Sequence, residues 1–191
     1  FNGAIINETE SRAVLHTALR SSGNDVVDKT LNKIINMSDE INNAKRLGYS
    51  GKKITDVVNI GIGGSHLGPE MVTEALGYYS NGVKPHFISN IDPDFTSKLL
   101  KDLNPETTIF IIVSKTFTTI ETLENANKVR AWFIDNASEV AIKDHFIAIS
   151  NNTEAPKKFG VSLDNILSIP DWVGGRFSLW GSVGLIISIV I

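Results

Sequence analysis

Cysteine is absent from the 191 residues, and histidine occurs only four times. A chain without thiols can form neither a disulfide framework nor a thiolate metal site. The histidines are scattered along the chain and do not show the spacing of metal ligands. We therefore expect no metal centre and no bound cofactor.

Basic clusters and long apolar runs are missing as well. The net charge is −3 and no run of Lys and Arg stands out, which argues against nucleic acid as a partner. The longest apolar stretch, residues 183–191, is too short to span a bilayer, and residues 1–10 do not have the order of a signal peptide. The sequence thus predicts a soluble cytoplasmic protein that binds neither nucleic acid nor membrane.

The composition is that of an ordinary globular protein, with 42% hydrophobic and 20% charged residues. Short β-rich runs alternate with helical patterns through most of the chain. The expected strands are residues 57–62, 85–89, 108–113, 145–150 and 166–169, and the expected helices are residues 69–76, 93–103 and 118–137, with a short helical turn near 155–159. This alternation predicts βαβ units, a parallel sheet and the α/β class.

The N-terminal part is expected to be helical instead. Apolar residues at helical spacing predict one helix over residues 9–20 and another over residues 25–46. We therefore expect an N-terminal helical segment, residues 1–50, before an α/β domain at residues 51–191. The apolar run that closes the chain has no cap and no charge, so we expect this domain to be truncated and the chain to be a fragment of a longer protein.

A dense group of polar side chains follows the apolar run 109–113. Lys115 and five hydroxyl groups fall within residues 114–122, where the strand pattern gives way to a helical one. Thr118 and Glu121 fit a capping box, and a helix N-terminus stabilises a dianion through its free amides and dipole. This pattern predicts a phosphate site. A threonine-rich loop whose hydroxyls cap their own backbone is the alternative.

Two other loops also follow predicted strands, at the edge of the sheet where α/β proteins bind ligands. The glycine-rich residues 61–68 do not match the dinucleotide fingerprint, because His66 stands where it needs its third glycine. A tight packing turn is the alternative there. In residues 172–180 two glycines precede Arg176, whose guanidinium suits an oxyanion, although a solvated turn has the same composition.

No nucleophile–base triad or pair of carboxylates is evident, so the residues by themselves indicate a binder of an anionic ligand. The other histidines fall on predicted helix and strand positions, which indicates structural roles. They are His16, His86 and His145.

Taken together and in order, these motifs closely resemble the glucose-6-phosphate isomerase family. The matching segments are residues 7–20, 58–69, 87–93, 114–122 and 174–180. The resemblance implies a sugar isomerase (SIS) domain, which is a doubly wound, five-stranded parallel sheet flanked by helices. It also implies an aldose–ketose isomerase of glycolysis and gluconeogenesis that interconverts glucose 6-phosphate and fructose 6-phosphate through an enediol, and a homodimer in the full-length protein.

The resemblance further implies a role for each site residue. The phosphate pocket comprises Ser114, Lys115, Thr116, Thr119 and Thr122. Gly64, Ser65 and Gly175 bind the rest of the substrate, and Arg176 is the catalytic residue that stabilises the enediol intermediate. In the family the glutamate base and the groups for ring opening lie further along the chain, so residues 1–191 alone are expected to be inactive.

Two other functions are alternatives to this one. A non-enzymatic phosphosugar-binding SIS module is the main alternative, although no basic recognition helix accompanies the domain. An NAD-dependent oxidoreductase is disfavoured by His66 and by the lack of a well-placed acidic residue for the ribose.

Overall fold

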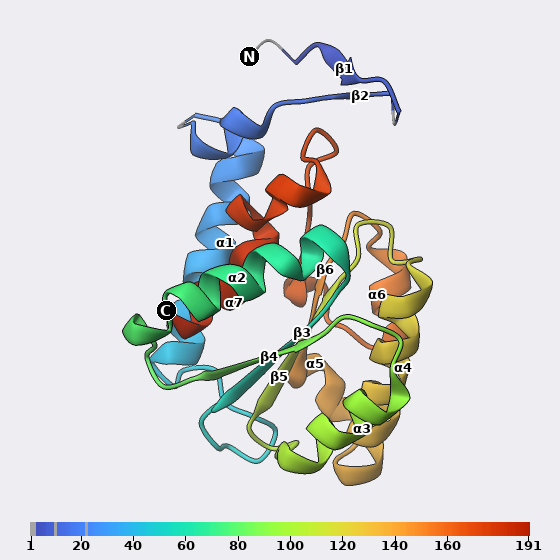
Figure 1. Ribbon diagram of the computed structural model, residues 1–191. Helices are drawn as coiled ribbons and strands as arrows, with labels where there is room; N and C mark the ends of the chain where they lie inside the picture. Colours follow the sequence, from blue (N-terminus) through green and yellow to red (C-terminus); the bar gives the residue numbers. More distant parts are fainter. Residues whose placement is uncertain (1–2, 10, 22) are drawn as a thin grey trace.

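A five-stranded parallel sheet forms the centre of the computed structural model, which describes residues 3–9, 11–21 and 23–191 (Figure 1). The strands are β3 (Asp56–Ile60), β4 (Lys84–Ile88), β5 (Thr108–Val113), β6 (Phe146–Ile149) and β7 (Ile166–Leu167). Their order in the sheet is β4-β3-β5-β6-β7, and each neighbouring pair is parallel. The predicted α/β class and five-stranded parallel sheet are confirmed.

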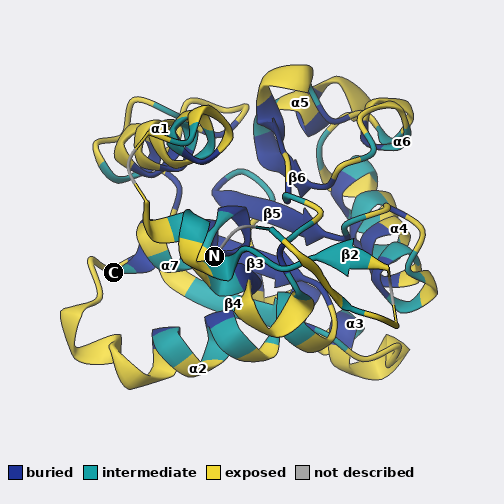
Figure 2. Cartoon of the chain, turned by 90° about the horizontal axis from the view of Figure 1, so that it is seen from above, coloured by how far each residue is buried: buried dark blue, intermediate teal, exposed yellow. Residues whose placement is uncertain are grey.

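Helices cover both faces of this sheet. They are α1 (Asp25–Asn42), α2 (Leu67–Ala75), α3 (Pro93–Asp102), α4 (Ile120–Asn136), α5 (Ile142–His145), α6 (Glu154–Phe159) and α7 (Leu185–Val190). Helices α1 and α7 pack on one face, and α3 and α4 pack on the other. Seen along a perpendicular direction, the inner strands β3, β5 and β6 are almost wholly buried, whereas the edge strand β4 is only partly buried and the outer sides of the helices are exposed (Figure 2).

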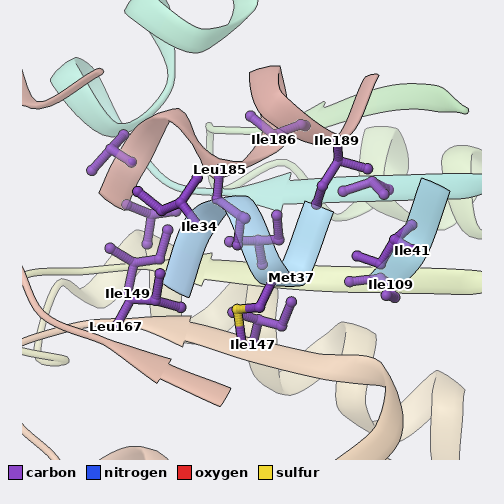
Figure 3. Packing of buried hydrophobic residues seen from close by; sticks show 14 of the residues in the cluster. Ile34, Met37, Ile41, Ile109, Ile147, Ile149, Leu167, Leu185, Ile186 and Ile189 are labelled. Atoms are coloured by element: carbon purple, nitrogen blue, oxygen red, sulfur yellow. The ribbon is translucent and has the colours of Figure 1, made fainter. Parts of the chain in front are cut away.

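Alternate residues of the central strand supply two separate cores. Ile109 and Ile111 of β5 pack with Ile34 of α1 and Leu185 of α7 in one core (Figure 3). The residue between them, Phe110, belongs to the other core. Because successive strand side chains point to opposite faces, a strand buried on both sides is apolar throughout. This explains why the apolar run 109–113 appeared continuous in the sequence.

The predicted helix over residues 9–20 is wrong. Strand β1 (Ile5–Asn7) pairs antiparallel with β2 (Arg12–Ala13), and only a 3₁₀ turn, η1 (His16–Arg20), follows. Ser11, with φ of 51°, turns the chain, and the Leu15 N–H donates to the carbonyl of Trp172, far away in sequence. Long-range pairing has overridden a helical pattern of apolar residues here.

The predicted helix over residues 25–46 is confirmed as α1, although it ends at Asn42. Asn24 caps it by accepting hydrogen bonds from the N–H groups of Val26 and Val27. Since α1 packs into the same core as the sheet, the division at residue 50 stays a prediction.

No helix within the described ranges is long and apolar enough to cross a membrane. The same residues contain no cluster of His, Asp and Glu side chains that could hold a metal ion.

Candidate functional site

The strand order creates a switch point between β3 and β5. After β3 the chain forms β4, which pairs with one edge of β3, and then β5, which pairs with the opposite edge of β3. In open α/β sheets, ligands bind beyond the carboxyl ends of the strands at such a point. The segments that leave these two ends are residues 61–66 and 114–119, both of which the sequence singled out.

The loop after β5, residues 114–119, is held by its own hydroxyl groups. Ser114 Oγ lies 3.1 Å from Thr119 Oγ1, and Thr116 Oγ1 lies 2.6 Å from Thr118 Oγ1. Phe117 adopts a left-handed conformation, with φ of 57°, which is strained for a residue with a bulky side chain. Its buried ring makes an edge contact with Phe159 in the core and so holds this conformation. Strain of this kind gathers at functional sites.

Helix α4 begins without a side-chain cap. Its N-cap residue is Thr119, whose hydroxyl makes no bond to the helix, so the predicted capping box of Thr118 and Glu121 is wrong. The reason is that these hydroxyls bond to one another instead. The first amides of a helix have no partners within it, and no side chain of the described residues caps those of α4. The N-terminus of α4 is therefore open to an anion.

Thr122, in the first turn of α4, adds a further observation. Its side-chain oxygen is buried and has no hydrogen-bond partner among the residues that the structure describes. Buried hydroxyls are nearly always paired, so an orphan beside an uncapped helix start favours a ligand at this position. The hydroxyls of Ser114 and Thr119 are thus in contact and Thr122 follows in the first turn of α4; their role as a phosphate pocket stays a prediction.

The loop after β3 packs directly against the loop that carries Arg176. Gly64 lies in a 3₁₀ turn, η2 (Gly63–Ser65), and a Cβ atom there would overlap the carbonyl group of Gly175 and lie 2.9 Å from the nitrogen of Arg176. Only glycine permits this approach. The carbonyl of Ser65 accepts a hydrogen bond of 2.9 Å from Asn59 Nδ2, which fixes the end of the turn to β3.

Arg176 stands in the 3₁₀ segment η6 (Gly175–Trp180) and is exposed. Its guanidinium carbon lies 6.0 Å from the ring centroid of Phe177, and that ring stacks on His16 at 3.9 Å. The N–H of Gly174 donates to His16 Nε2 at 2.9 Å. Burial, and then the charge of Arg176, lower the pKa of His16, so the imidazole stays neutral and accepts this bond.

A cavity of about 680 Å³ opens beside this segment. It is lined by Arg176, Gly175 and Asp171 together with His16 and residues of the β1–β2 hairpin. The sequence indicated only a structural role for His16, because the predicted helix over residues 9–20 gave no sign that its ring would meet Gly174.

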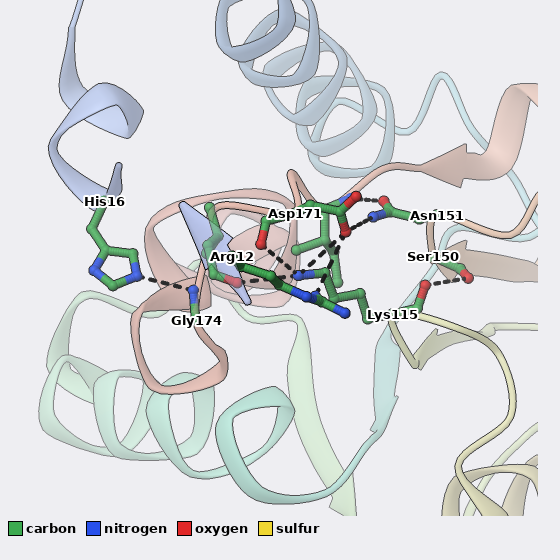
Figure 4. A network of polar contacts seen from close by, with 9 residues as sticks. Arg12, His16, Lys115, Ser150, Asn151, Asp171 and Gly174 are labelled. Carbon is green, nitrogen blue, oxygen red and sulfur yellow. Dashed lines mark hydrogen bonds and ion pairs between the residues drawn. The ribbon is translucent and has the colours of Figure 1, made fainter. Parts of the chain in front are cut away.

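Lys115 connects the two parts of the site. Its Nζ atom donates to the carbonyl oxygens of Asp171, at 3.1 Å, and Val173, at 3.4 Å, and it lies 3.6 Å from the carboxylate of Asp171 (Figure 4). Lys115, which the sequence predicts to bind the phosphate, therefore contacts the segment that leads to Arg176. The sequence did not predict a role for Asp171, because a single carboxylate before Trp172 matches no catalytic pattern.

Comparison with known proteins identifies the family of this chain. A family model of phosphoglucose isomerase matches residues 1–191. The chain belongs to the phosphoglucose isomerase family. The resemblance stated from the sequence motifs is thereby confirmed.

A member of the phosphoglucose isomerase family from Christiangramia forsetii, described as a glucose-6-phosphate isomerase, is 52% identical over 202 aligned residues. The alignment covers 100% of this chain but 37% of that protein, so the chain spans little more than a third of the length of this relative. The structure of a glucose-6-phosphate isomerase from Chlamydia trachomatis matches 95% of this chain and 36% of its own, with 28% identity and a TM-score of 0.78.

The fold itself is shared more widely. The sugar isomerase domain of an RpiR transcription factor from Sphaerobacter thermophilus covers 86% of this chain and 81% of its own, at a TM-score of 0.53 and 16% identity. Likeness at that identity shows a common fold, and it confirms the predicted SIS-type architecture.

Proposed function

We propose that the full-length protein is a glucose-6-phosphate isomerase that interconverts glucose 6-phosphate and fructose 6-phosphate in glycolysis and gluconeogenesis. Family membership and the relatives' described activity support this proposal. The observation that carries it within the molecule is the uncapped N-terminus of α4, which lies at the switch point among hydroxyl side chains. Such a helix end binds a phosphate dianion without a metal or cofactor.

In this proposal the phosphate of the sugar sits at the start of α4. The hydroxyls of Ser114, Thr116 and Thr119 and the first amides of the helix donate to its oxygens. The buried hydroxyl of Thr122 gains the partner that it lacks among the described residues. Lys115 contributes positive charge nearby while its Nζ atom holds the segment of Asp171 and Val173.

Arg176 would act on the reacting end of the sugar. Isomerisation moves a proton between C2 and C1, and removal of that proton by a base leaves an enediolate, whose oxygen carries negative charge that the reacting carbons of the substrate do not have. A guanidinium beside this oxygen stabilises the transition state more than the ground state, and so raises kcat. Gly64 and Ser65, from the loop after β3, and Gly175, from the loop that carries Arg176, would line the sugar where these two loops meet. The glutamate base that the family resemblance implies would come from beyond residue 191.

The family resemblance also supports two further proposals, on the oligomeric state and on the location of the full-length protein. The full-length protein is expected to be a homodimer and to work in the cytoplasm. Light scattering across a range of concentrations tests the first, and cell fractionation tests the second.

The deciding experiment is a coupled assay of the full-length protein in both directions, with glucose as the non-phosphorylated control substrate. We expect turnover of both sugar phosphates and none of glucose. Ser114→Ala should raise KM, whereas Thr30→Val should not, since the Thr30 hydroxyl donates to the carbonyl of Val26 within its own helix. A folded full-length protein that turns over neither sugar phosphate would refute the proposal.

A further inference from the structure

Asp171 joins segments of the site that are far apart in sequence. It lies between β7 and the Gly174–Gly175–Arg176 sequence, and its Oδ1 atom meets donors from three other parts of the chain (Figure 4). Asn151 Nδ2 lies 3.2 Å away, Lys115 Nζ 3.6 Å and Arg12 Nη1 3.7 Å. These donors follow β6, follow β5 and belong to β2, respectively.

The backbone reinforces the same junction. Lys115 Nζ donates to the carbonyls of Asp171 and Val173, while the carbonyl of Lys115 accepts from the N–H of Asn151 at 2.8 Å and from the hydroxyl of Ser150 at 3.2 Å. The loop after β5 and the loop after β7 are therefore tied together through a lysine that belongs to the first and an aspartate that belongs to the second.

Asp171 also faces the cavity that Arg176 lines. Among the described residues, no hydrogen bond or ion pair involves the guanidinium of Arg176, which lies over the ring of Phe177. The orientation of Arg176 thus depends on the backbone that carries it. That backbone is held at Gly174 by His16 and, three residues earlier, at Asp171.

From this geometry we propose that Asp171 is a positioning residue for the isomerisation. Its carboxylate holds the Arg176 segment in a fixed place relative to the phosphate loop, with Lys115 as the connection. A sugar phosphate bound at α4 then presents its reacting carbons to Arg176 at the correct distance. This inference rests on the proposed function and adds a residue that contacts neither the phosphate nor the reacting atoms.

The exposure of Asp171 separates this role from a structural one. Its side chain is 75% exposed, and ion pairs of exposed groups add little to stability because water screens them. Loss of the carboxylate should therefore leave the fold almost unchanged while Arg176 shifts. Small misplacements of a catalytic group can reduce turnover strongly, on the order of 100-fold for 1 Å.

The test is Asp171→Asn in the full-length protein, which keeps the shape and the backbone bonds. Glu139→Gln is the matched control, since Glu139 is 71% exposed and also pairs with an arginine, Arg130, away from the site. For Asp171→Asn we expect kcat to fall about tenfold, KM to change less than about threefold, and Tm to match that of the control. Asp171→Glu, which keeps the charge, should recover part of the loss.

Three outcomes would overturn the inference. If the wild-type protein isomerises and Asp171→Asn keeps the kcat of Glu139→Gln, Asp171 does not position Arg176 and the proposed function stands. If kcat falls together with Tm and Asp171→Glu restores neither, the role is structural. If the folded wild-type protein isomerises neither sugar phosphate, the proposed function fails and this inference fails with it.

Discussion

The loop after β5 and the segment that carries Arg176 are built in opposite ways. In the first, residues 114–119 are neighbours in sequence, and their hydroxyls bond to one another beside an uncapped helix. In the second, residues 174–176 make contacts with His16, Gly64 and, through Asp171, with Lys115 and Arg12. One is local, and the other is assembled from the whole chain.

This difference separates two tasks. A phosphate can be bound by one helix start and its adjoining loop, because the donors are all in one stretch of chain. Stabilising charge that develops during a reaction requires a group placed precisely against that ligand, and several elements must agree on its position. Substitutions in the local loop should therefore weaken binding, whereas those around Arg176 should slow the reaction.

The largest effect is expected for Arg176→Ala. If Arg176 meets charge that appears only in the enediolate, kcat of the full-length protein should fall on the order of 10²–10³-fold, as for a lost oxyanion donor. Arg176→Lys should also be impaired, because the planar guanidinium cannot be replaced by a point charge. Steady-state kinetics, with circular dichroism to check folding, provides the measurement. A higher KM at unchanged kcat would reduce Arg176 to a binding residue and remove the contrast between the two loops.

Gly64→Ala tests how closely the assembled half is packed. The new Cβ would overlap the Gly175 carbonyl, so one of the two backbones must move, at a cost of about 1–3 kcal/mol in the free energy of unfolding. Turnover should fall as well, because Arg176 follows Gly175. Gly77→Ala is the control, since a Cβ at Gly77 meets nothing within 4 Å. Equal stability and kcat for the two variants in denaturant titrations and assays would contradict the packing argument.

The double substitution Thr119→Val and Thr122→Val probes the local half. Removing two donors to a charged phosphate should weaken sugar phosphate binding by roughly 1–3 kcal/mol. Because these donors act equally in the ground and transition states, KM should rise while kcat stays within about threefold. Calorimetric titration of the full-length double variant measures the affinity. An affinity equal to that of the wild type would place the phosphate elsewhere.

The smallest effect concerns pH and again belongs to the assembled half. The pKa of His16 is lowered from 6.5 by burial and by Arg176, so the folded protein binds fewer protons there than the unfolded chain. The bond from Gly174 to His16 is therefore intact above about pH 6.5 and contributes less as pH falls below that value.

Thermal unfolding between about pH 8 and about pH 5.5 tests this prediction. We expect Tm of the wild type to fall slightly more toward acid than Tm of His16→Gln, whose amide oxygen accepts the bond without titrating. His145, whose pKa burial also lowers, titrates in both proteins and cancels in the comparison. Parallel curves for the two proteins would show that the bond does not respond to pH.

Much of the architecture followed from the sequence because its causes are local. Apolar runs such as residues 109–113 predict buried strands wherever they pack, and Asp92 before Pro93 begins α3 by accepting from the N–H groups at 94 and 95. The density of hydroxyls after β5 likewise predicts an anion site, which stays a prediction, beside a helix start that the structure shows to be uncapped. The family resemblance adds expected roles for Gly64, Ser65 and Arg176, and these roles stay predictions.

Other features depended on tertiary structure alone. The helical pattern over residues 9–20 did not form one helix, because residues 12 and 13 pair with β1 while Leu15 and His16 bond to the backbone at Trp172 and Gly174. No local pattern encodes partners so distant. The capping box of Thr118 and Glu121 failed because Thr119 is the N-cap residue of α4 and the Thr118 hydroxyl bonds to Thr116 instead. The proposed role of Asp171 depends on the meeting of its own segment with those of Arg12, Lys115 and Asn151. Short-range propensity thus determined most strands and helices and the hydroxyl-rich loop after β5, whereas the position of Arg176 was decided by packing between residues more than a hundred positions apart.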